Sequence, residues 1–365
     1  MSDDNKYMLL AIEQAELGKG KVSPNPLVGC VIVKNDKVIA TGYHKEFGGP
    51  HAEVDAISKI DGNLKGCTVY VTLEPCTPLG KTPPCADLLV KKQPDRVVIA
   101  MEDPNPIVKG NGVSTLVGNG IETSVGILED KAKALNRVFI TNMLENRPLV
   151  TAKFAMTLDG FMAQKDHESK WISCEDSRTD VHKFRSLVDA ILVGSGTVRQ
   201  DNPMLDVRLV EGRNPKRIIL ASHLQLPLTS HLLKDENAKK NTIIYCTNEA
   251  QNIKLVDQMR SEGLNVKSIS KNSKGKVDVS LALRDLLKEY NIGHIMLEGG
   301  AKLFSEFFEL DLIDEIITYQ SPKILGAGIS PFEYIRPLHL SDNSRFQLTN
   351  TEVIGTDIKA VWVRK

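Results

Sequence analysis

The sequence has no net charge, few aromatic residues and no long apolar run. Its 365 residues include 46 Lys and Arg against 46 Asp and Glu, and only 5% are Phe, Trp or Tyr. Proteins that grip nucleic acid normally carry a basic excess, so this balance argues against a nucleic-acid partner. A membrane span needs roughly twenty consecutive apolar residues, and none is present. The polar start, Met1 to Lys6, lacks the apolar core of a secretory signal, so a cytoplasmic protein is expected.

Cysteine is also scarce, with six in the chain. In a reducing compartment these residues are not expected to form a disulfide framework. Cys30 and Cys67 stand in apolar runs, which predicts buried positions. Cys174 and Cys246 belong to no recognisable pattern and are interpreted as structural. The remaining two cysteines belong to a motif.

That motif is His51-Ala52-Glu53 followed by Pro75-Cys76 and then Cys85. One His and two Cys supply three zinc ligands and leave the fourth tetrahedral position for water, as in catalytic zinc sites. The pattern His-x-Glu then Pro-Cys is the signature of zinc-dependent base deaminases, in which the Glu carries protons without binding the metal. The alternatives are simple burial of the two cysteines and a helix-start carboxylate at Glu53.

Strands and helices alternate along the chain, which predicts α/β sheets with helices on both faces. In the first half, helices are expected over 7–17, 51–60, 85–92, 113–117 and 129–144, and strands over 30–33, 37–40, 68–73, 96–101 and 123–127, with Asn35-Asp36 as a hairpin turn. In the second half, strands are expected over 149–155, 190–193, 217–220, 242–245, 294–297 and 315–319, and helices over 179–185, 252–262, 280–290 and 301–308.

Asn146-Arg147-Pro148 interrupts this alternation. Pro disfavours helix at the residue before it, so a boundary is expected here, and the chain is also long for one hydrophobic core. We therefore predict two domains, residues 1–146 and 147–365.

The first domain resembles the deaminase half of the bifunctional riboflavin-biosynthesis deaminase/reductases. The resemblance rests on Ser23-Pro24-Asn25-Pro26-Leu27-Val28-Gly29 and on the stretched loop from Cys76 to Cys85 that contains Gly80-Lys81-Thr82-Pro83-Pro84. It implies a cytidine-deaminase-like α/β/α sandwich, a bound Zn²⁺ held by His51, Cys76 and Cys85, and catalysis by Glu53. The implied substrate is a diaminopyrimidinone that carries a ribosyl 5′-phosphate.

The same resemblance implies substrate contacts at Asn25, His44, Lys81 and Thr82. Lys can meet a phosphate as a point charge, and an Asn amide can both donate and accept along a pyrimidine edge. The alternatives are a turn residue for Asn25, a solvated charge for Lys81 and a surface histidine for His44. The family usually has Ser-His after the first Cys, where this chain has Thr77-Pro78, so one substrate contact is in doubt.

The second domain resembles the riboflavin reductases, which have the dihydrofolate-reductase fold and use NADPH. The matching blocks, in order, are Leu158-Asp159-Gly160, Ser169-Lys170-Trp171-Ile172-Ser173, His182-Lys183-Phe184-Arg185, Val193-Gly194-Ser195-Gly196-Thr197-Val198, Asp201-Asn202-Pro203-Met204-Leu205 and Leu297-Glu298-Gly299-Gly300. The Gly-x-Gly-x-x-Gly fingerprint is absent, so no Rossmann domain is predicted. Gly299-Gly300 between a strand and a helix could let backbone amides approach a pyrophosphate.

By resemblance, the cofactor contacts are Ala155, Trp171, Thr197, Asp201, Ser222, Gly299 and Gly300, and the reductase substrate contacts are Ser169, Arg185, Leu205, Arg208 and Glu298. The alternatives are tight turns for the glycines, a core aromatic for Trp171 and surface ion pairs for the arginines. Ala221 stands where the family has an acidic residue, which puts the cofactor contacts in doubt. No general acid for the reduction emerges from the sequence.

The resemblance thus implies two steps of riboflavin biosynthesis, a zinc-dependent deamination and an NADPH-dependent reduction of the ribosyl group. It also implies a homo-oligomer. One alternative is a stand-alone deaminase whose second domain only binds or regulates. A second alternative is a nucleic-acid editor of the same deaminase fold, which the neutral charge disfavours.

Overall fold

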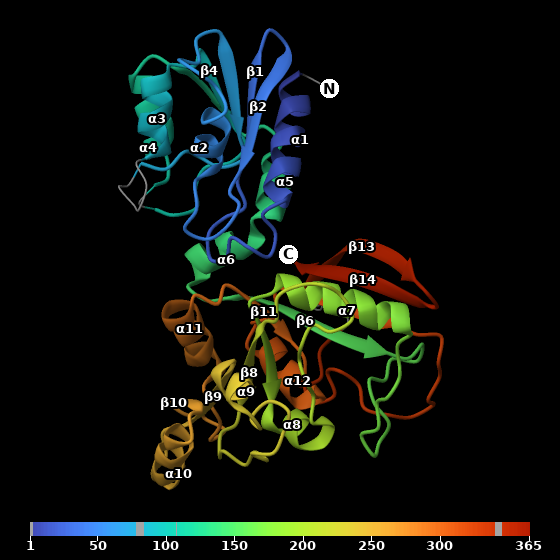
Figure 1. Cartoon of the computed structure of the whole chain (residues 1–365). Helices are drawn as coiled ribbons and strands as arrows, with labels where there is room; N and C mark the ends of the chain where they lie inside the picture. Colours follow the sequence, from blue (N-terminus) through green and yellow to red (C-terminus); the bar gives the residue numbers. More distant parts are fainter. Residues whose placement is uncertain (1–2, 78–83, 107, 340–344) are drawn as a thin grey trace. The chain divides into compact units, whose positions relative to one another are not determined.

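A computed structural model describes residues 3–77, 84–106, 108–339 and 345–365. The chain forms two compact units, Met1–Arg147 and Pro148–Lys365. Each is an α/β unit with one sheet, drawn in blue to green for the first and green to red for the second (Figure 1). Within the described residues, no helix combines the length and apolar character that crossing a membrane requires.

The first unit has a five-stranded sheet in the order β2-β1-β3-β4-β5. Its elements are α1 (Asp3–Glu16), β1 (Gly29–Lys34), β2 (Lys37–Tyr43), α2 (Ala52–Ile57), β3 (Cys67–Val71), α3 (Cys85–Lys92), β4 (Arg96–Ile99), α4 (Asn111–Gly118), β5 (Glu122–Val125), α5 (Glu129–Leu135) and α6 (Arg137–Glu145). β1 pairs antiparallel with β2 and with β3, while β3, β4 and β5 run parallel.

Alternate side chains of these strands enter two separate cores. On β1, Ile32 packs with residues of α2, α3 and α4, whereas Val31 and Val33 pack with residues of α1 and α5. The strand period of two explains this division, because successive side chains point to opposite faces. The α/β/α sandwich expected from the sequence is therefore confirmed, and Cys30 and Cys67 are buried as predicted.

Two local features of this unit concern sequence predictions. Asn35 and Asp36 both have positive φ, at 49° and 58°, which suits the predicted hairpin turn. The single helix predicted over 129–144 is wrong, because the chain leaves helical geometry at Asn136. The buried Asn136 amide bonds both backbone polar groups of Leu27: Oδ1 accepts from its N–H at 2.8 Å and Nδ2 donates to its carbonyl at 2.9 Å. This contact holds the segment that carries Asn25.

The second unit has a nine-stranded sheet in the order β10-β9-β8-β7-β11-β6-β12-β14-β13. Its elements are β6 (Leu149–Met156), α7 (Glu175–Leu187), β7 (Ala190–Gly194), α8 (Ser195–Asp201), β8 (Lys216–Leu220), α9 (Glu236–Lys240), β9 (Thr242–Thr247), α10 (Ala250–Ser261), β10 (Asn265–Ile269), α11 (Val279–Tyr290), β11 (His294–Leu297), α12 (Ala301–Glu309), β12 (Glu315–Gln320), β13 (Phe346–Ile354) and β14 (Asp357–Arg364). The strands from β10 to β12 run parallel, and β14 and β13 are antiparallel.

Helices cover both faces of this parallel region. α11 and α12 pack with Val150, Leu192 and Ile295 on one face, while α7, α8 and α10 pack with Ile191 and Met296 on the other. The carboxyl ends of neighbouring parallel strands therefore meet at one edge of the sheet, where ligands of open α/β sheets bind.

The C-terminal hairpin was not predicted from the sequence. β13 and β14 are joined at Gly355, which has a φ of 57°. Along β13, residues 347–353 are exposed, so the strand has no apolar face that a pattern search would detect.

Candidate active sites

The three predicted zinc ligands come together in the first unit. His51 Nδ1 lies 3.5 Å from Cys76 Sγ and 3.3 Å from Cys85 Sγ. Tetrahedral zinc bonds of about 2.1 Å to nitrogen and 2.3 Å to sulfur place such atoms roughly 3.6 Å apart. Together these residues form a metal-sized cluster with all ligand atoms within 4.8 Å. The residues present therefore fit a zinc ion.

Helix starts position these ligands. His51 is the N-cap of α2, and Cys85 is the first residue of α3. Cys76 Sγ accepts a hydrogen bond from the Cys85 backbone N–H at 3.4 Å. The Cys85 thiol, aided by His51, lowers the pKa of Cys76 against the effect of burial. A thiolate at this position is ready to bind metal, because cysteine binds zinc in its deprotonated form.

Glu53 lies in the first turn of α2 and is only 3% exposed. Burial raises the pKa of its carboxyl above the usual value. The side chain lines a small pocket of about 170 Å³ together with His51 and Cys76. A carboxyl that can hold a proton therefore faces the same space as the metal ligands.

Asn25 and His44 line this pocket too. Asn25 Nδ2 lies 3.0 Å from His44 Nε2, and His44 Nδ1 lies 2.9 Å from the Pro50 carbonyl. His44 is 3% exposed, so its interpretation as a surface histidine is wrong. Burial lowers the pKa of His44. Lys81, Thr82 and Pro78, on which other predictions depend, lie outside the described residues.

Two acidic residues of this site were not identified from the sequence. Glu74 is buried, and its two carboxylate oxygens accept backbone N–H groups from Asp103, Gly110, Gly112 and Val113 at 2.9 to 3.2 Å. Asp103 lines the pocket, and burial raises its pKa to about 6. The only available sequence signal was the position of Glu74 directly before Pro75-Cys76.

The second unit contains a much larger pocket, of about 1020 Å³. Every residue predicted to contact the reductase cofactor or substrate lines it: Ala155, Ser169, Trp171, Arg185, Thr197, Asp201, Leu205, Arg208, Ser222, Glu298, Gly299 and Gly300. These residues come from the ends of β6, β7, β8 and β11 and from the segments that follow them. The pocket thus lies at the carboxyl edge of the parallel strands.

The Gly299-Gly300 segment suits a phosphate-rich cofactor. Gly300 is the N-cap of the nine-residue helix α12 and follows β11. A Cβ built on Gly300 would meet no atom within 4 Å, so a side chain there would occupy pocket space. Backbone N–H groups at a helix start attract phosphate. The residues present therefore fit a dinucleotide.

Trp171 and Ala221 concern two points that the sequence left open. Trp171 is 58% exposed with the Arg178 guanidinium 4.5 Å over its ring, so its interpretation as a core aromatic is wrong. Ala221 is 1% exposed and belongs to the core cluster of Val181 and Ile219; it is not itself among the residues that line the pocket. The missing acidic side chain therefore changes a core position. Ser222 Oγ accepts the Val277 N–H at 3.1 Å.

Arg185 and Arg208 both have acidic partners. Arg185 Nε and Nη2 donate to Glu298 at 2.9 to 3.0 Å, and Arg208 Nη1 pairs with Asp206. Both arginines line the pocket, where Arg185 is 11% exposed and Arg208 is 45% exposed. Burial raises the pKa of Glu298, but Arg185 and Lys153 outweigh it, so its pKa lies below the usual value.

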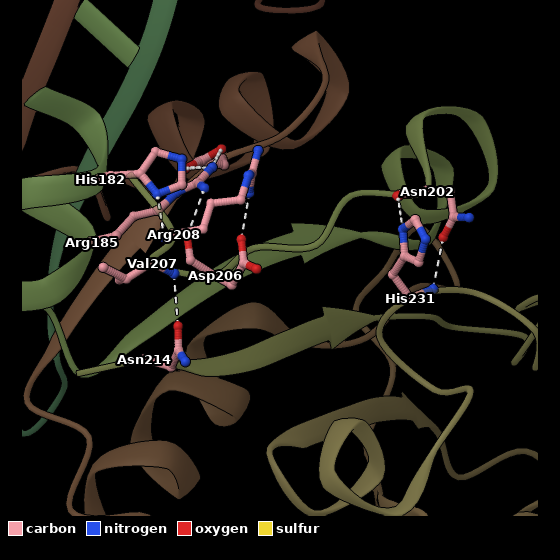
Figure 2. A network of polar contacts seen from close by, with 9 residues as sticks. His182, Arg185, Asn202, Asp206, Val207, Arg208, Asn214 and His231 are labelled. Atoms are coloured by element: carbon pink, nitrogen blue, oxygen red, sulfur yellow. Dashed lines mark hydrogen bonds and ion pairs between the residues drawn. The ribbon is translucent and has the colours of Figure 1, made fainter. Parts of the chain in front are cut away.

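Two further pocket residues were not identified from the sequence. Burial lowers the pKa of Lys153, which lines the pocket from β6. His182 is 3% exposed, and burial together with the charges of Arg185 and Arg208 lowers its pKa to about 4. His182 lies beside both arginines (Figure 2). His182 stands in one of the blocks that match the reductases, and Lys153 lies shortly before the block Leu158-Asp159-Gly160, but neither residue was assigned a role from the sequence.

Two family models match the chain. The model described as RibD C-terminal domain covers residues 148–360, and the cytidine and deoxycytidylate deaminase zinc-binding region covers residues 1–101. The riboflavin biosynthesis protein RibD of Aquifex aeolicus is 41% identical over 90% of this chain and 89% of its own length. RibD of Bacillus amyloliquefaciens is 38% identical over 98% and 96%.

Solved structures agree with these matches over the full length. Acinetobacter baumannii RibD superposes with a TM-score of 0.87 at 36% identity and covers 100% of this chain and 99% of its own. A diaminohydroxyphosphoribosylaminopyrimidine deaminase/5-amino-6-(5-phosphoribosylamino)uracil reductase from Thermotoga maritima gives 0.86 at 38% identity, with the same coverage.

Proposed function

The chain belongs to the RibD family of bifunctional riboflavin-biosynthesis enzymes, and from this premise we propose which residues carry its two reactions. The enzyme is a zinc-dependent deaminase and an NADPH-dependent reductase in one chain. It deaminates 2,5-diamino-6-(5-phosphoribosylamino)pyrimidin-4(3H)-one and then reduces the ribosyl group to give 5-amino-6-(5-phosphoribitylamino)uracil. Residues 1–146 carry the first step and residues 147–365 the second.

For the deamination, His51, Cys76 and Cys85 would hold the zinc. The supporting observation is the fit of their three ligand atoms to tetrahedral spacing. Zinc, when bound, acts as a Lewis acid that activates water for attack. The Glu53 carboxylate would take one proton from the attacking water and pass it to a ring nitrogen. It would then take the proton of the new hydroxyl group and pass it to the amino group, which leaves as ammonia.

The rest of the small pocket binds the pyrimidine. The Asn25 amide meets one edge of the ring, and its bond to His44 holds that amide in place. His44 is fixed in turn by the Pro50 carbonyl. Lys81 and Thr82 would bind the phosphate end of the substrate.

For the reduction, Gly299 and Gly300 would bind the cofactor pyrophosphate, and Ala155, Trp171, Thr197, Asp201 and Ser222 would contact the rest of the dinucleotide. NADPH, when bound, supplies hydride to C1 of the ribosyl group. Ser169, Arg185, Leu205, Arg208 and Glu298 would hold the substrate, with both arginines at its phosphate.

Opening the sugar converts its ring oxygen to a hydroxyl, which needs a proton. Lys153 is the candidate donor, because it lines the pocket and burial lowers the pKa of its ammonium group. A lysine with a lowered pKa releases a proton more readily than an exposed one. Replacing Lys153 by Met should leave deamination intact and abolish reduction. NADPH oxidation with the pre-deaminated substrate measures this, and an active Lys153→Met enzyme would exclude the role.

The test of the whole assignment is incubation with the diaminopyrimidinone phosphate, with and without NADPH, followed by mass analysis. Deaminated product should accumulate without NADPH and the ribityl product should appear with it. A chain that never consumes NADPH would support the alternative of a binding domain.

A second copy of this chain is the proposed partner. β13 is an edge strand with residues 347–353 exposed, and Val353 is 76% exposed. Unpaired backbone groups on such an edge favour pairing with another strand. Sedimentation measures this: the wild type should be an oligomer, and Val353→Lys, which places a charge on the exposed strand, should weaken it. A monomeric wild type would contradict the proposal.

The balanced charge supports a small-molecule substrate without nucleic acid, and six free cysteines support a cytoplasmic location.

A further inference from the structure

His182 occupies a special position among the charged residues of the reductase pocket. It lies on α7 one turn before Arg185, is 3% exposed and lines the pocket. Its Nδ1 accepts a hydrogen bond from the backbone N–H of Arg208 at 3.1 Å. Because a backbone N–H can only donate, Nδ1 must be the unprotonated ring nitrogen. The proton of the neutral ring is therefore on Nε2.

Nε2 is the available donor of this ring. Among the described residues, none forms a hydrogen bond to it, whereas the neighbouring arginines are engaged. Arg185 directs Nε and Nη2 to Glu298 and Nη1 to the Asp206 carbonyl, and Arg208 pairs with the Asp206 carboxylate. A ligand can therefore bind the Nε2–H of His182 without breaking an ion pair, whereas binding either arginine competes with a carboxylate.

The same histidine helps to fix the segment 206–208. The backbone of each of these three residues forms a hydrogen bond to a side chain. The Asp206 carbonyl accepts from Arg185 at 3.1 Å, and the Val207 N–H donates to Asn214 Oδ1 at 2.7 Å. The Arg208 N–H donates to His182. Figure 2 shows these partners converging on one segment. The backbone of Arg208 is therefore held while its side chain, 45% exposed, can turn towards a ligand.

We propose that His182 is a further residue of the substrate-phosphate subsite, with Nε2–H donating to the phosphate while Nδ1 holds the backbone of Arg208. The inference rests on the proposed placement of the phosphate at Arg185 and Arg208. A phosphate group offers several acceptor oxygens, and two carboxylates, Glu298 and Asp206, stand close by. A third donor without a carboxylate partner lets the subsite bind an anion in this mixed surrounding.

Two substitutions separate the two ring nitrogens. In His182→Asn, the amide oxygen can replace Nδ1 as acceptor for Arg208 N–H, but the Nε2 donor is lost. In His182→Gln, the longer amide can place an N–H near the Nε2 position. Each variant is assayed by NADPH oxidation with the deaminated substrate and with its dephosphorylated form. Deaminase activity of the same chain and NADPH binding report whether the variant is folded.

The expected result for His182→Asn is a KM for the phosphorylated substrate raised about tenfold or more, the loss typical of a hydrogen bond to a charged group. The KM for NADPH should stay within about twofold, and the dephosphorylated substrate should react as with the wild type. His182→Gln should recover part of the preference for the phosphorylated substrate. An unchanged KM in His182→Asn, or an equal loss with both substrates, would overturn the proposal.

If His182→Asn does not fold, His182→Gln decides, and a folded His182→Gln that treats both substrates alike overturns the proposal. Arg208→Lys tests the subsite itself. If Arg208→Lys leaves the phosphate preference intact, the phosphate lies elsewhere and the proposed function needs revision, independently of the outcome for His182.

Discussion

Arg185 and Glu298 face each other in the reductase pocket, where Arg185 donates to both oxygens of Glu298 at 2.9 to 3.0 Å. The side chains of Arg185 and Glu298 are 11% and 17% exposed, so this ion pair is largely buried before any ligand binds. Arg208 is the more exposed arginine, at 45%. Removing one partner of a buried pair leaves the other charge uncompensated. Arg185 is therefore a poor site for a clean binding test, and Arg208 is the better one.

Arg208→Lys should raise the KM for the substrate of the reductase about tenfold while the KM for NADPH stays close to that of the wild type. Lysine keeps the charge but cannot reproduce the bidentate geometry of a guanidinium at phosphate. The matched control is Arg213→Lys, whose residue pairs with Asp189 away from the pocket lining. A rise in the KM for NADPH alone would mean that our assignment of substrate and cofactor regions is wrong.

Gly300→Val should give the opposite pattern. A Cβ at position 300 would meet no atom within 4 Å, so there is open space where the side chain begins. The added side chain would keep the backbone from the pyrophosphate, and we expect the KM for NADPH to rise at least tenfold with little change for the substrate. Titration of NADPH fluorescence checks this without turnover. Wild-type NADPH affinity in Gly300→Val would place the pyrophosphate elsewhere.

Cys76→Ser and Cys85→Ser should each lose zinc and deamination but keep the reductase activity. Serine is a poor replacement for a thiolate ligand of zinc. The cysteines and the reductase pocket lie in separate units, so the reduction should not be affected. Metal analysis of purified protein, with NADPH oxidation on the pre-deaminated substrate as the internal control, measures both effects. Full zinc content in both variants would refute the ligand assignment.

Glu53→Gln should keep zinc and lose deamination by roughly a hundred- to ten-thousandfold, the usual contribution of a general acid–base group. The amide has nearly the same shape as the carboxyl but cannot carry the proton. Ammonia release, measured beside the zinc content, tests the prediction. Near wild-type ammonia release would rule out Glu53 as the proton carrier.

Glu74→Gln should lower the free energy of unfolding of the deaminase unit by about 3 kcal/mol. At least two of the four backbone N–H groups would then face an amide N–H instead of an oxygen, and hydrogen bonds to charged groups contribute about 1.5–3 kcal/mol each. Glu102→Gln, at an exposed ion pair with Lys109, is the control and should change stability by less than about 0.5 kcal/mol. Chemical denaturation compares the three proteins.

Acid should destabilise the reductase unit partly through His182. Its pKa is lowered to about 4, whereas a histidine in an unfolded chain titrates at about 6.5. A depressed folded pKa contributes stability that is complete above about pH 6.5 and is lost as the pH falls towards 4, because the unfolded state takes up the proton first. Thermal unfolding between pH 4 and 7 should therefore show a shallower pH dependence for His182→Asn. Parallel curves for the two proteins would argue against a neutral buried ring.

The clustering of His51, Cys76 and Cys85 could be predicted because their residue types are chemically specific. Few arrangements other than a metal site explain His51, Cys76 and Cys85 with an adjacent Glu53, so the sequence carried the chemistry directly. His182 stood in a block that matches the reductases, but the sequence did not indicate its contact, since that contact is to the backbone N–H of Arg208, a group that every residue but proline has. Its proximity to that group exists only in the folded chain.

Burial was the other limit of sequence reasoning. Of the two interpretations of His44, a substrate contact and a surface histidine, the second was wrong because the Pro50 carbonyl and Asn25 give the ring partners inside the fold. The long helix predicted over 129–144 was wrong because a tertiary contact from Asn136 to Leu27 interrupts it. In both cases the local sequence pattern is compatible with either structure, and a contact with a segment distant in the sequence determines which one forms.

The position of β11 has a consequence for how the protein is made. Residues 294–297 pair with 149–152 on one side, and 295–297 pair with 190–192 on the other, so the middle of the large sheet stays open until that late strand has left the ribosome. Until then, β6 and β7 each have an edge whose backbone groups lack the β11 partner. Such long-range parallel pairing is slow and exposes the chain to aggregation. The first unit, whose strands all precede residue 126, can close much sooner. During synthesis, we therefore expect chaperone dependence to reside in the second half of the chain.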